Sequence, residues 1–528
     1  MYKIRLQIAA ALLILLWVPS MLMAQSAGTG ALTGTITDPT GAVVPNVTVT
    51  LTSTDTNQAR TATTGADGTY KFNLLPPGTY RVRFTANGFK TSEVAGVNIN
   101  VTETPTLDRA LEVGAQSDQV TVEASAETIQ TASSTLGTVV GSREVAALPL
   151  TTRNYTQILG LSAGANVGVN NASNFGKGTQ DISVNGANIN QNNYQMDGVA
   201  VANFAGTGIA SDSGIYAGIG VPNPDALQEF KIQTSTYDAS YGRNPGANVN
   251  VVTKSGTNSF HGSAFEFFRN KQLNANDFFR NRSCGLNLAP CLAGGGVKQI
   301  LNQNQFGGTI GGPIKKDKMF FFISYQETRQ LNGVGTQGNS APVLPLLPAG
   351  DRSNTAAFRS ALGSIWCPDN HASDPALARY KTQAGGLQVA CDGSNINPVT
   401  IKFLQLKLPN GSYYIPGSTG SNFQQNTFST PARFTEHQAV GNWDWALTPK
   451  ESLQARFFTG QGPQTVPFSN ANGELPGTPV DLLYANTNAA LKLTSIVTNT
   501  LLNEARLSFQ RNLAAANNGV PSPQLNWA

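Results

Sequence analysis

Histidine is the commonest metal ligand and a frequent acid–base group, and this sequence holds three: His261, His371 and His437. They lie far apart along the chain. Only His371 and Asp374 are spaced like a pair of metal ligands, and one such pair is a weak signal. A zinc peptidase needs paired His and Glu ligands around an open metal position. Since no such set, acid–base pair or nucleophile arrangement stands out, we predict a protein that is not an enzyme and has no cofactor.

The cysteines offer a second kind of chemistry. They are Cys284, Cys291, Cys367 and Cys391. An even number of cysteines in an exported chain indicates disulfides, and the economical pairing joins Cys284 to Cys291 and Cys367 to Cys391. A zinc site is the alternative, although no spacing is CxxC and no histidine lies near the first pair. We expect the disulfides to staple loop segments that lack a core of their own.

Export is predicted by the opening residues MYKIRLQIAAALLILLWVPSMLMAQS, in which Lys3 and Arg5 precede an apolar run from Ile8 to Val18. Ala24 offers a cleavage point, so we expect a signal peptide over 1–24. A membrane anchor is the alternative, but the run is short for a spanning helix of roughly 20 residues.

The composition points to a β-rich protein of the cell surface or outer membrane. Charged residues make up 12% of the 528 residues, about half the usual share in soluble proteins. The formal net charge is +4, and the Lys and Arg residues are scattered. Because no basic stripe could follow a phosphate backbone, nucleic acid is not an expected partner.

The segment 25–114 is a run of short alternating strands separated by turn signals. VTVTLTST and TYRVRF alternate apolar and polar residues, and Asp-Pro-Thr-Gly, Gly-Ala-Asp-Gly and Pro-Pro-Gly lie between such strands. Six or seven strands at this spacing predict a small β-sandwich. The stretch TGADGTYKFNLLPPGTYRVRFTANGFK resembles carboxypeptidase regulatory-like domains, which have a transthyretin-like sandwich fold.

One short alternating strand stands in the linker 115–130 with no obvious sheet to join. Its residues are Asp118, Gln119, Val120, Thr121, Val122, Glu123 and Ala124. It could be the last strand of the sandwich, a plain linker, or a strand offered to a partner, since an extended peptide can add to a sheet edge through main-chain hydrogen bonds. Its position alone leaves these alternatives open.

The remaining chain changes character twice. The region 131–256 reads as mixed α/β, with helices near 142–147 and 155–159 and with asparagine at strand positions, which indicates a domain that meets water on many sides. From Asn258 we expect strands at 258–269, 304–312, 318–329, 433–447, 452–460, 487–497 and 502–512. The intervals between them are alternately tight and long, which is the loop pattern of an outer-membrane barrel.

The faces of these strands agree with a barrel that contacts outer-membrane lipid. Within 433–447, Trp443 and Trp445 lie on one face, whereas Glu436 and Asp444 lie on the other. Apolar residues facing lipid and polar residues facing a wet lumen are typical of such strands. The tryptophans precede a tight turn, where an interfacial aromatic girdle is expected.

Four stretches carry a family resemblance: LPLTTRNYTQIL, SVNGANINQNNYQMDGVAV, PDALQEFKIQTSTYDASYGRNPGANVNVVTKSGTNSFHGSAFEFFRN and NQFGGTIGGPIKKDKMFFFISY. They resemble the plug and first barrel strands of TonB-dependent outer-membrane receptors, in particular the Oar-like group. The resemblance implies a plug over 131–256 and a partial barrel with long extracellular loops over 257–528. It implies a plug motif of Arg153, Asn154, Asp197, Gly198, Tyr241, Gly242 and Arg243. Lys254 to Asn258 would form the corner between plug and barrel.

The resemblance also implies a function and a place in the cell. Asp118 to Ala124 matches the position of the TonB box, the strand gripped by a periplasmic TonB-type energy transducer. We therefore expect an outer-membrane receptor that imports a bulky ligand, an oligosaccharide or a peptide, with energy from the inner-membrane proton gradient. The alternative is a surface adhesion or assembly protein without transport. The residues do not identify the extracellular ligand.

The expected fold is thus mainly β: an N-terminal sandwich, a mixed α/β plug and the first strands of an antiparallel barrel. Receptors of this family have plugged barrels of about 22 strands, whereas we expect seven. We therefore expect the chain to be a fragment of a protein of about 1,100 residues.

Overall fold

The computed structural model describes most of the chain. The described residues are 28–114, 119–122, 135–168, 174–178, 181–201, 220–237, 241, 245–275, 298–334, 339–340, 347–348, 350–367, 389–407, 411, 413, 415, 428–429, 431–466, 480–498 and 501–518. The expected signal peptide lies outside them.

The N-terminal part is a sandwich of two sheets, whose strand orders are β4-β1-β7 and β3-β2-β5-β6-β8. The strands are β1 (Gly30–Thr37), β2 (Thr48–Ser53), β3 (Ala59–Thr63), β4 (Thr69–Leu75), β5 (Gly78–Thr85), β6 (Thr91–Ile99), β7 (Arg109–Ala110) and β8 (Gln119–Val122). Their inward residues form one apolar core that includes Leu32, Val49, Val82 and Phe84. The alternation seen in the sequence therefore does build a sandwich.

Of the alternatives left open for the strand in the linker, the structure shows the first: it is paired as the last strand of a sandwich sheet. β8 pairs with β6 in parallel, with Thr91 opposite Gln119 and Val94 opposite Val122. A sequence pattern could not show this pairing, because a parallel partner lies far away in the chain and no hairpin turn announces it.

A plug region follows. Its elements are β9 (Leu136–Gly141), α2 (Ser142–Ala147), η1 (Tyr155–Leu161), β10 (Ala165–Val167), β11 (Ile182–Val184), η2 (Ile189–Gln191), β12 (Asn193–Met196), β13 (Val199–Ala200), η3 (Pro224–Ala226), β14 (Leu227–Ser235) and β15 (Asn248–Thr253). Five of the strands form one sheet in the order β13-β12-β15-β14-β9. Asn154 starts η1, since its side chain accepts from the Thr156 amide. The expected second helix is thus a 3₁₀ helix.

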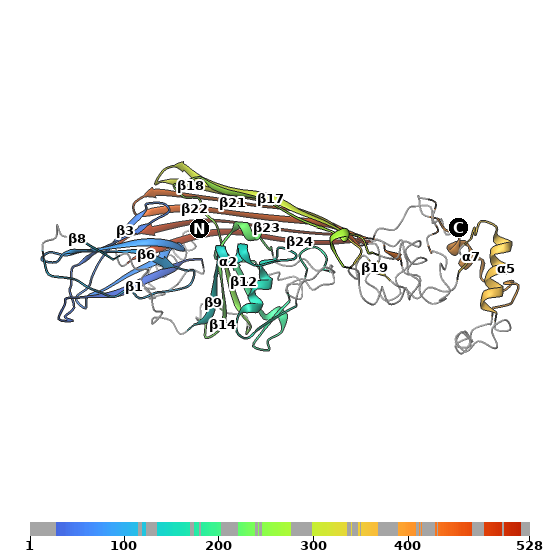
Figure 1. The fold of residues 1–528 in the computed structure, drawn as a ribbon, viewed down its shortest axis with the longest axis horizontal. Coiled ribbons are helices and arrows are strands. Elements are labelled where there is room, and N and C mark those ends of the chain that lie inside the picture. The colour runs from blue at the N-terminus through green and yellow to red at the C-terminus, as the bar shows by residue number, and fades with distance from the viewer. Residues whose placement is uncertain are drawn as a thin grey trace, which may run out of the picture.

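The C-terminal part is a wall sheet of seven antiparallel strands in sequence order. They are β16 (His261–Asn270), β17 (Leu301–Lys315), β18 (Met319–Asn332), β21 (Ala432–Thr448), β22 (Glu451–Val466), β23 (Val480–Ile496) and β24 (Leu502–Asn518). Most are longer than expected, and β23 begins before the predicted 487. The sandwich lies at one end of these long strands, and the plug region lies along their middle (Figure 1).

The two faces of the wall sheet differ as predicted. Gln326 and Gln438 are buried on the face that contacts the plug region, whereas Ile323 and Leu507 on the opposite face are 51% and 74% exposed. The plug core itself includes three wall side chains, Phe322, Val440 and Phe458. The plug-facing side of the wall is therefore mainly polar, with a few apolar contacts.

The end of the wall opposite the sandwich carries the long loops, including η4 (Lys271–Leu273), β19 (Asn339–Ser340), α5 (Thr355–Trp366), α7 (Pro398–Leu404) and β20 (Phe428–Ser429) (Figure 1). The loop between β18 and β21 has a small apolar core that includes Phe358, Leu362, Ile401 and Leu404. Cys367 and Cys391 form a disulfide there. The described residues of this loop therefore share a core, contrary to the expectation that the stapled segments lack one.

Within the described part of the chain, no helix combines the length and the apolar character needed to cross a membrane.

Candidate functional site

The corner where the plug region becomes the wall is fixed to β21. Ser255 Oγ donates to Asp444 Oδ2 at 2.5 Å, and Asn442 Nδ2 donates to the Lys254 carbonyl at 2.7 Å. A Cβ on Gly256 would lie 2.3 Å from a backbone carbonyl oxygen of β18. Because a larger residue would clash there, glycine allows the corner to lie flat against the wall.

Arg153 of the expected plug motif joins the plug region to the wall. It forms an ion pair with Asp225 and donates from Nε to Gln326 Oε1 at 2.9 Å. Its guanidinium also lies 4.4 and 4.3 Å from the ring centroids of Phe265 and Phe267. A planar cation can make these contacts at once. They explain why β16 carries aromatic residues on its plug-facing side.

Asn154, the next motif residue, has a structural role. It is fully buried, its Oδ1 accepts from the Thr156 amide at 3.0 Å, and its Nδ2 donates to the Lys177 carbonyl at 3.1 Å. Lys177 in turn lies 3.2 Å from Glu436 of the wall. Asn154 therefore shapes the turn that brings Lys177 against β21.

Asp197 and Gly198 form the two-residue turn between β12 and β13, both with positive φ, at 51° and 77°. Asp197 accepts from the backbone and hydroxyl of Thr253, at 3.0 and 2.8 Å. The Gly198 carbonyl accepts from Arg506 of β24, and a Cβ on Gly198 would lie 2.3 Å from that guanidinium. This turn is a second polar connection between plug region and wall.

Of the last three residues of the plug motif, the structure describes only Tyr241, which is buried. Gly242 and Arg243 lie outside the described residues.

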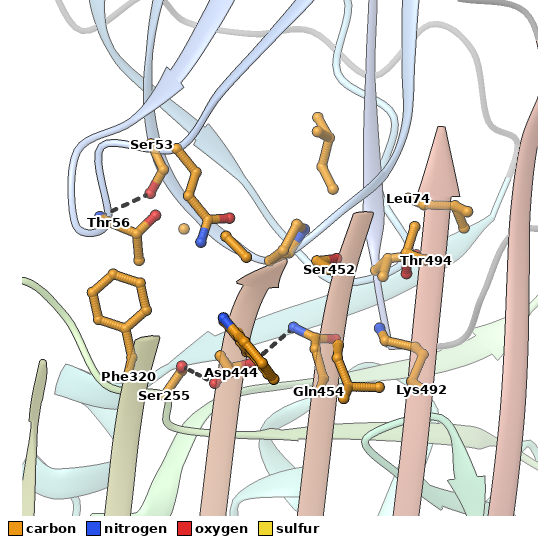
Figure 2. Close-up of a pocket in the computed structure, with 18 of the residues that line it drawn as sticks. Ser53, Thr56, Leu74, Ser255, Phe320, Asp444, Ser452, Gln454, Lys492 and Thr494 are labelled. Atoms are coloured by element: carbon orange, nitrogen blue, oxygen red, sulfur yellow. Dashed lines mark hydrogen bonds between the residues drawn. The ribbon is translucent and has the colours of Figure 1, made fainter. Parts of the chain in front are cut away.

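A cavity of about 560 Å³ lies between the sandwich loops, the plug corner and the nearby end of the wall. Figure 2 shows Ser53 of the sandwich on one side and Gln454 and Lys492 of the wall on the other. Gln454 and Arg456 both donate to Asp444 Oδ1, at 2.8 and 2.7 Å. The wall side of the cavity thus carries a hydrogen-bonded group of polar and charged side chains, beside apolar lining residues such as Phe320 and Leu453.

The sandwich contacts the plug region through the segment that follows β6. The Val101 amide donates to Glu229 Oε1 at 2.5 Å, and Lys231 Nζ donates to Glu103 Oε1 at 3.0 Å. Glu229 is 6% exposed, and this burial raises the pKa of its carboxyl to about 7. The contact therefore contains a carboxyl group that titrates near neutral pH.

The candidate TonB box is described only over Gln119–Val122, which is β8. Its other residues, Asp118, Glu123 and Ala124, lie outside the described residues. β8 is the last strand of its sheet. The chain has therefore brought this strand to a sheet edge, next to β6.

The described residues contain no group of three or more His, Cys, Asp or Glu side chains that could hold a metal ion. His437 Nδ1 lies 2.9 Å from the Tyr325 hydroxyl, and His261 Nδ1 lies 3.0 Å from the Ser259 carbonyl. The Cα atoms of Cys367 and Cys391 are 4.8 Å apart across their disulfide. Cys284, Cys291 and His371 lie outside the described residues.

Sequence reasoning did not single out Asp225, Glu229 or Arg506. Arg506 lies in the predicted strand 502–512, but the sequence could not show its partner. Glu229 alternates with apolar residues in β14, on the same side as Lys231 and Gln233, so no sequence signal indicated that it would be buried against another part of the molecule.

Comparisons with known proteins agree with this architecture. Residues 252–526 match the family described as outer membrane beta barrel domain, and residues 31–112 match the carboxypeptidase regulatory-like domain. The chain is 29% identical over 370 residues to the TonB-dependent transporter Oar of Myxococcus xanthus, which covers 65% of this chain and 32% of the relative. The chain thus spans about a third of the length of that relative.

Two solved structures align with parts of this chain. The outer membrane transporter YddB from Escherichia coli is 9% identical with a TM-score of 0.43, over 72% of this chain and 40% of that one. The siderophore receptor PirA from Pseudomonas aeruginosa is 10% identical with a TM-score of 0.36, over 72% and 41%. Both scores lie below 0.5.

The family match spans more than half of the chain and falls on the wall sheet and the corner that leads into it. The predicted fold class, outer-membrane location and non-enzymatic family are confirmed. The chain therefore belongs to the outer membrane beta barrel domain family and is related to the TonB-dependent transporter Oar, with a carboxypeptidase regulatory-like sandwich ahead of its plug region.

Proposed function

We propose that this protein imports a bulky ligand across the outer membrane, driven by the inner-membrane proton gradient through a TonB-type transducer. The observation that carries the proposal is the way the plug region is held. Asn223 Nδ2 donates to Ser324 Oγ at 3.0 Å, and Gln438 Nε2 donates to the Val221 carbonyl at 2.7 Å. Such polar contacts can exchange for contacts with water at a small net change in free energy.

The mechanism has three steps. A ligand binds at the loop end, the transducer grips the candidate TonB box at the opposite end, and the pull rearranges the plug region against the wall. Arg153 and the Asp197–Gly198 turn are among the polar connections that this movement would break. Water can replace their hydrogen bonds, which keeps the barrier low.

The ligand class rests on the loop end of the wall. The loop between β18 and β21 has its own apolar core, two helices and a disulfide. A loop with such a core in its described residues can offer a preformed contact surface, which suits a large ligand such as an oligosaccharide or a peptide. The Cys284 to Cys291 pairing remains part of this proposal.

We assign the parts of the chain accordingly. Residues 1–24 are a signal peptide, 25–114 the sandwich, 115–130 the linker with the candidate TonB box, 131–256 the plug and 257–528 the partial barrel. Arg153, Asn154, Asp197, Gly198, Tyr241, Gly242 and Arg243 are the plug motif, and Asp118 to Ala124 are the box.

The test is a proline scan of the box in a complete receptor. Proline at Val120, Thr121 or Val122 removes a backbone donor and restricts the preceding residue, so at least one variant should lose strand pairing with the transducer. Alanine at the same positions is the matched control, because strand addition depends mainly on the backbone.

Transport predicts that one or more proline variants lose ligand uptake while surface binding persists, since the ligand site lies at the other end of the wall. Collapse of the proton gradient should have the same effect. If all three proline variants import ligand as well as their alanine controls, the box assignment is wrong. Uptake that does not depend on the gradient would favour the adhesion or assembly function.

A further inference from the structure

We propose that the sandwich presents the TonB box as a ready-made edge strand, so that the transducer adds its own strand to β8 and extends the sandwich sheet. On this proposal β6 holds one edge of β8 while the transducer occupies the other. The inference rests on the proposed function, because it takes β8 to be part of the box.

The pairing of β8 carries the first step. Thr91, Ser92, Glu93 and Val94 of β6 stand opposite Gln119, Val120, Thr121 and Val122 of β8 in one unbroken parallel register. β8 ends the order β3-β2-β5-β6-β8, so within the described chain its second edge has no partner strand. An edge strand presents a row of free backbone N–H and C=O groups to any strand that approaches it.

The second step concerns conformational entropy. A disordered peptide that joins a partner's sheet loses the freedom of its backbone as it binds, about 1–2 kcal/mol for each residue that becomes ordered. The residues of β8 are already extended and in register on β6. A pre-ordered strand therefore binds more tightly than the same sequence in a free linker.

The third step concerns how a pull would travel. β6 runs on into Val101 and Glu103, which contact Glu229 and Lys231 of the plug region. A force applied to β8 would thus reach the plug region through the sheet and this contact as well as through the chain that follows β8. The sandwich would then be a force-bearing part of the complex.

The occupant of the free edge is an extended strand of the transducer's periplasmic domain. Recognition by main-chain hydrogen bonds fits a four-residue strand whose sequence alternates valine with polar residues. The opposite arrangement, in which β6 hides the box and must release it before the transducer can bind, makes a different prediction for a cross-link between the two strands.

The experiment is a cross-link across the register in the whole receptor, with Ser92→Cys combined with Val120→Cys. These residues are paired Cα neighbours, and adjacent strands lie about 4.8 Å apart, within the Cα range of a disulfide. Binding of the purified periplasmic domain of a TonB-type transducer is compared between the oxidised and reduced forms of the same protein. The two single-cysteine variants under the same treatments show what the reagents do to the natural cysteines.

We expect the cross-link to form and the oxidised form to bind the transducer within about threefold of the reduced form, or more tightly. Loss of binding by tenfold or more on oxidation, reversed by reduction, would overturn the proposal in favour of release. Failure of the two cysteines to cross-link in folded receptor would overturn it as well, because β8 would then not lie on β6.

The proline scan separates this inference from the proposed function. If proline in β8 abolishes transducer binding and the cross-link abolishes it too, the box assignment stands and only the sheet extension fails. If proline leaves transducer binding intact, both fail. If proline abolishes binding and the cross-link preserves it, both are supported.

Discussion

The interior of the sandwich and the contact between plug region and wall are built from different residues. The sandwich core is dry: Leu32, Val49 and Phe84 are all fully buried in a cluster of apolar side chains. The plug–wall contact buries Asn223, Ser324 and several Gln side chains instead.

This difference separates a fixed part from a movable part. A dry apolar core opens only by unfolding, since its stability comes from keeping apolar surface out of water. A polar contact can open and refill with water, because each hydrogen bond contributes only about 0.5–1.5 kcal/mol net. We infer that the sandwich moves as one body and that the plug–wall contact is the surface that rearranges.

Phe84→Ala should cause the largest loss of stability, and this loss should be confined to the sandwich. Removing a buried aromatic ring leaves a cavity and typically lowers the free energy of unfolding by about 3–5 kcal/mol. Urea unfolding followed by hydrogen exchange should show the loss in the sandwich amides but not in β15 or the wall. Phe84→Leu, which keeps most of the volume, should lose about 1–2 kcal/mol. Equal destabilisation of the plug would mean that the two parts are one cooperative unit.

Arg153→Ala should destabilise the plug region and its seating on the wall by about 2–3 kcal/mol, because it removes the contacts with the wall residue Gln326 and the two phenyl rings and leaves Asp225, also in the plug region, without its cation in a partly buried site. The sandwich should unfold as before. Arg153→Lys is the matched control, since it keeps the charge but loses the planar contacts with Gln326 and the two phenyl rings. Faster exchange of the η1 and β14 amides in Arg153→Ala than in Arg153→Lys is the expected result. Unchanged exchange in both would show that this connection does not hold the plug.

Glu229 should make the sandwich–plug contact weaker as pH rises. Burial raises the pKa of its carboxyl from 4.5 to about 7, so the folded state binds the proton more tightly than the unfolded state does. The stabilisation is present below pH 4.5 and is lost as pH rises to about 7.

The measurement is protection of the Val101 amide from hydrogen exchange, in the parent and in Glu229→Gln at each pH. Comparison at equal pH cancels the intrinsic exchange rate. Protection in the parent should fall relative to Glu229→Gln between about pH 5 and pH 8. Parallel curves would show that Glu229 does not control the contact.

The sequence predicted the wall best, because alternation and loop length are local signals. The predicted strand 433–447 is observed as Ala432–Thr448. β23 begins at Val480, earlier than predicted, because it continues as a paired hairpin into a stretch whose residues do not alternate cleanly. Strand pairing beyond the lipid-facing band leaves no periodic signal.

The candidate site was only partly predictable. The Asp197–Gly198 turn has a local signature, since Asp-Gly is the preferred dipeptide for a two-residue hairpin turn with positive φ. Arg153 could be named only through the family resemblance, because its partner Asp225 is far away in the chain. The pairing of β8 with β6 is likewise non-local, and four residues are too few to specify a partner.

The most direct test of the central claim, that transport requires the plug region to move against the wall, is a cross-link between Asn223→Cys and Ser324→Cys. The two side chains are buried and in hydrogen-bond contact across the plug–wall boundary at 3.0 Å, and the yield of the disulfide on oxidation is measured before transport. A cross-link within the wall, Ala439→Cys with Thr459→Cys on paired strands, is the matched control. Oxidation should abolish ligand uptake in the plug–wall variant without loss of surface binding, with recovery on reduction, and should leave the control unchanged. Full uptake through the oxidised plug–wall variant would contradict the account.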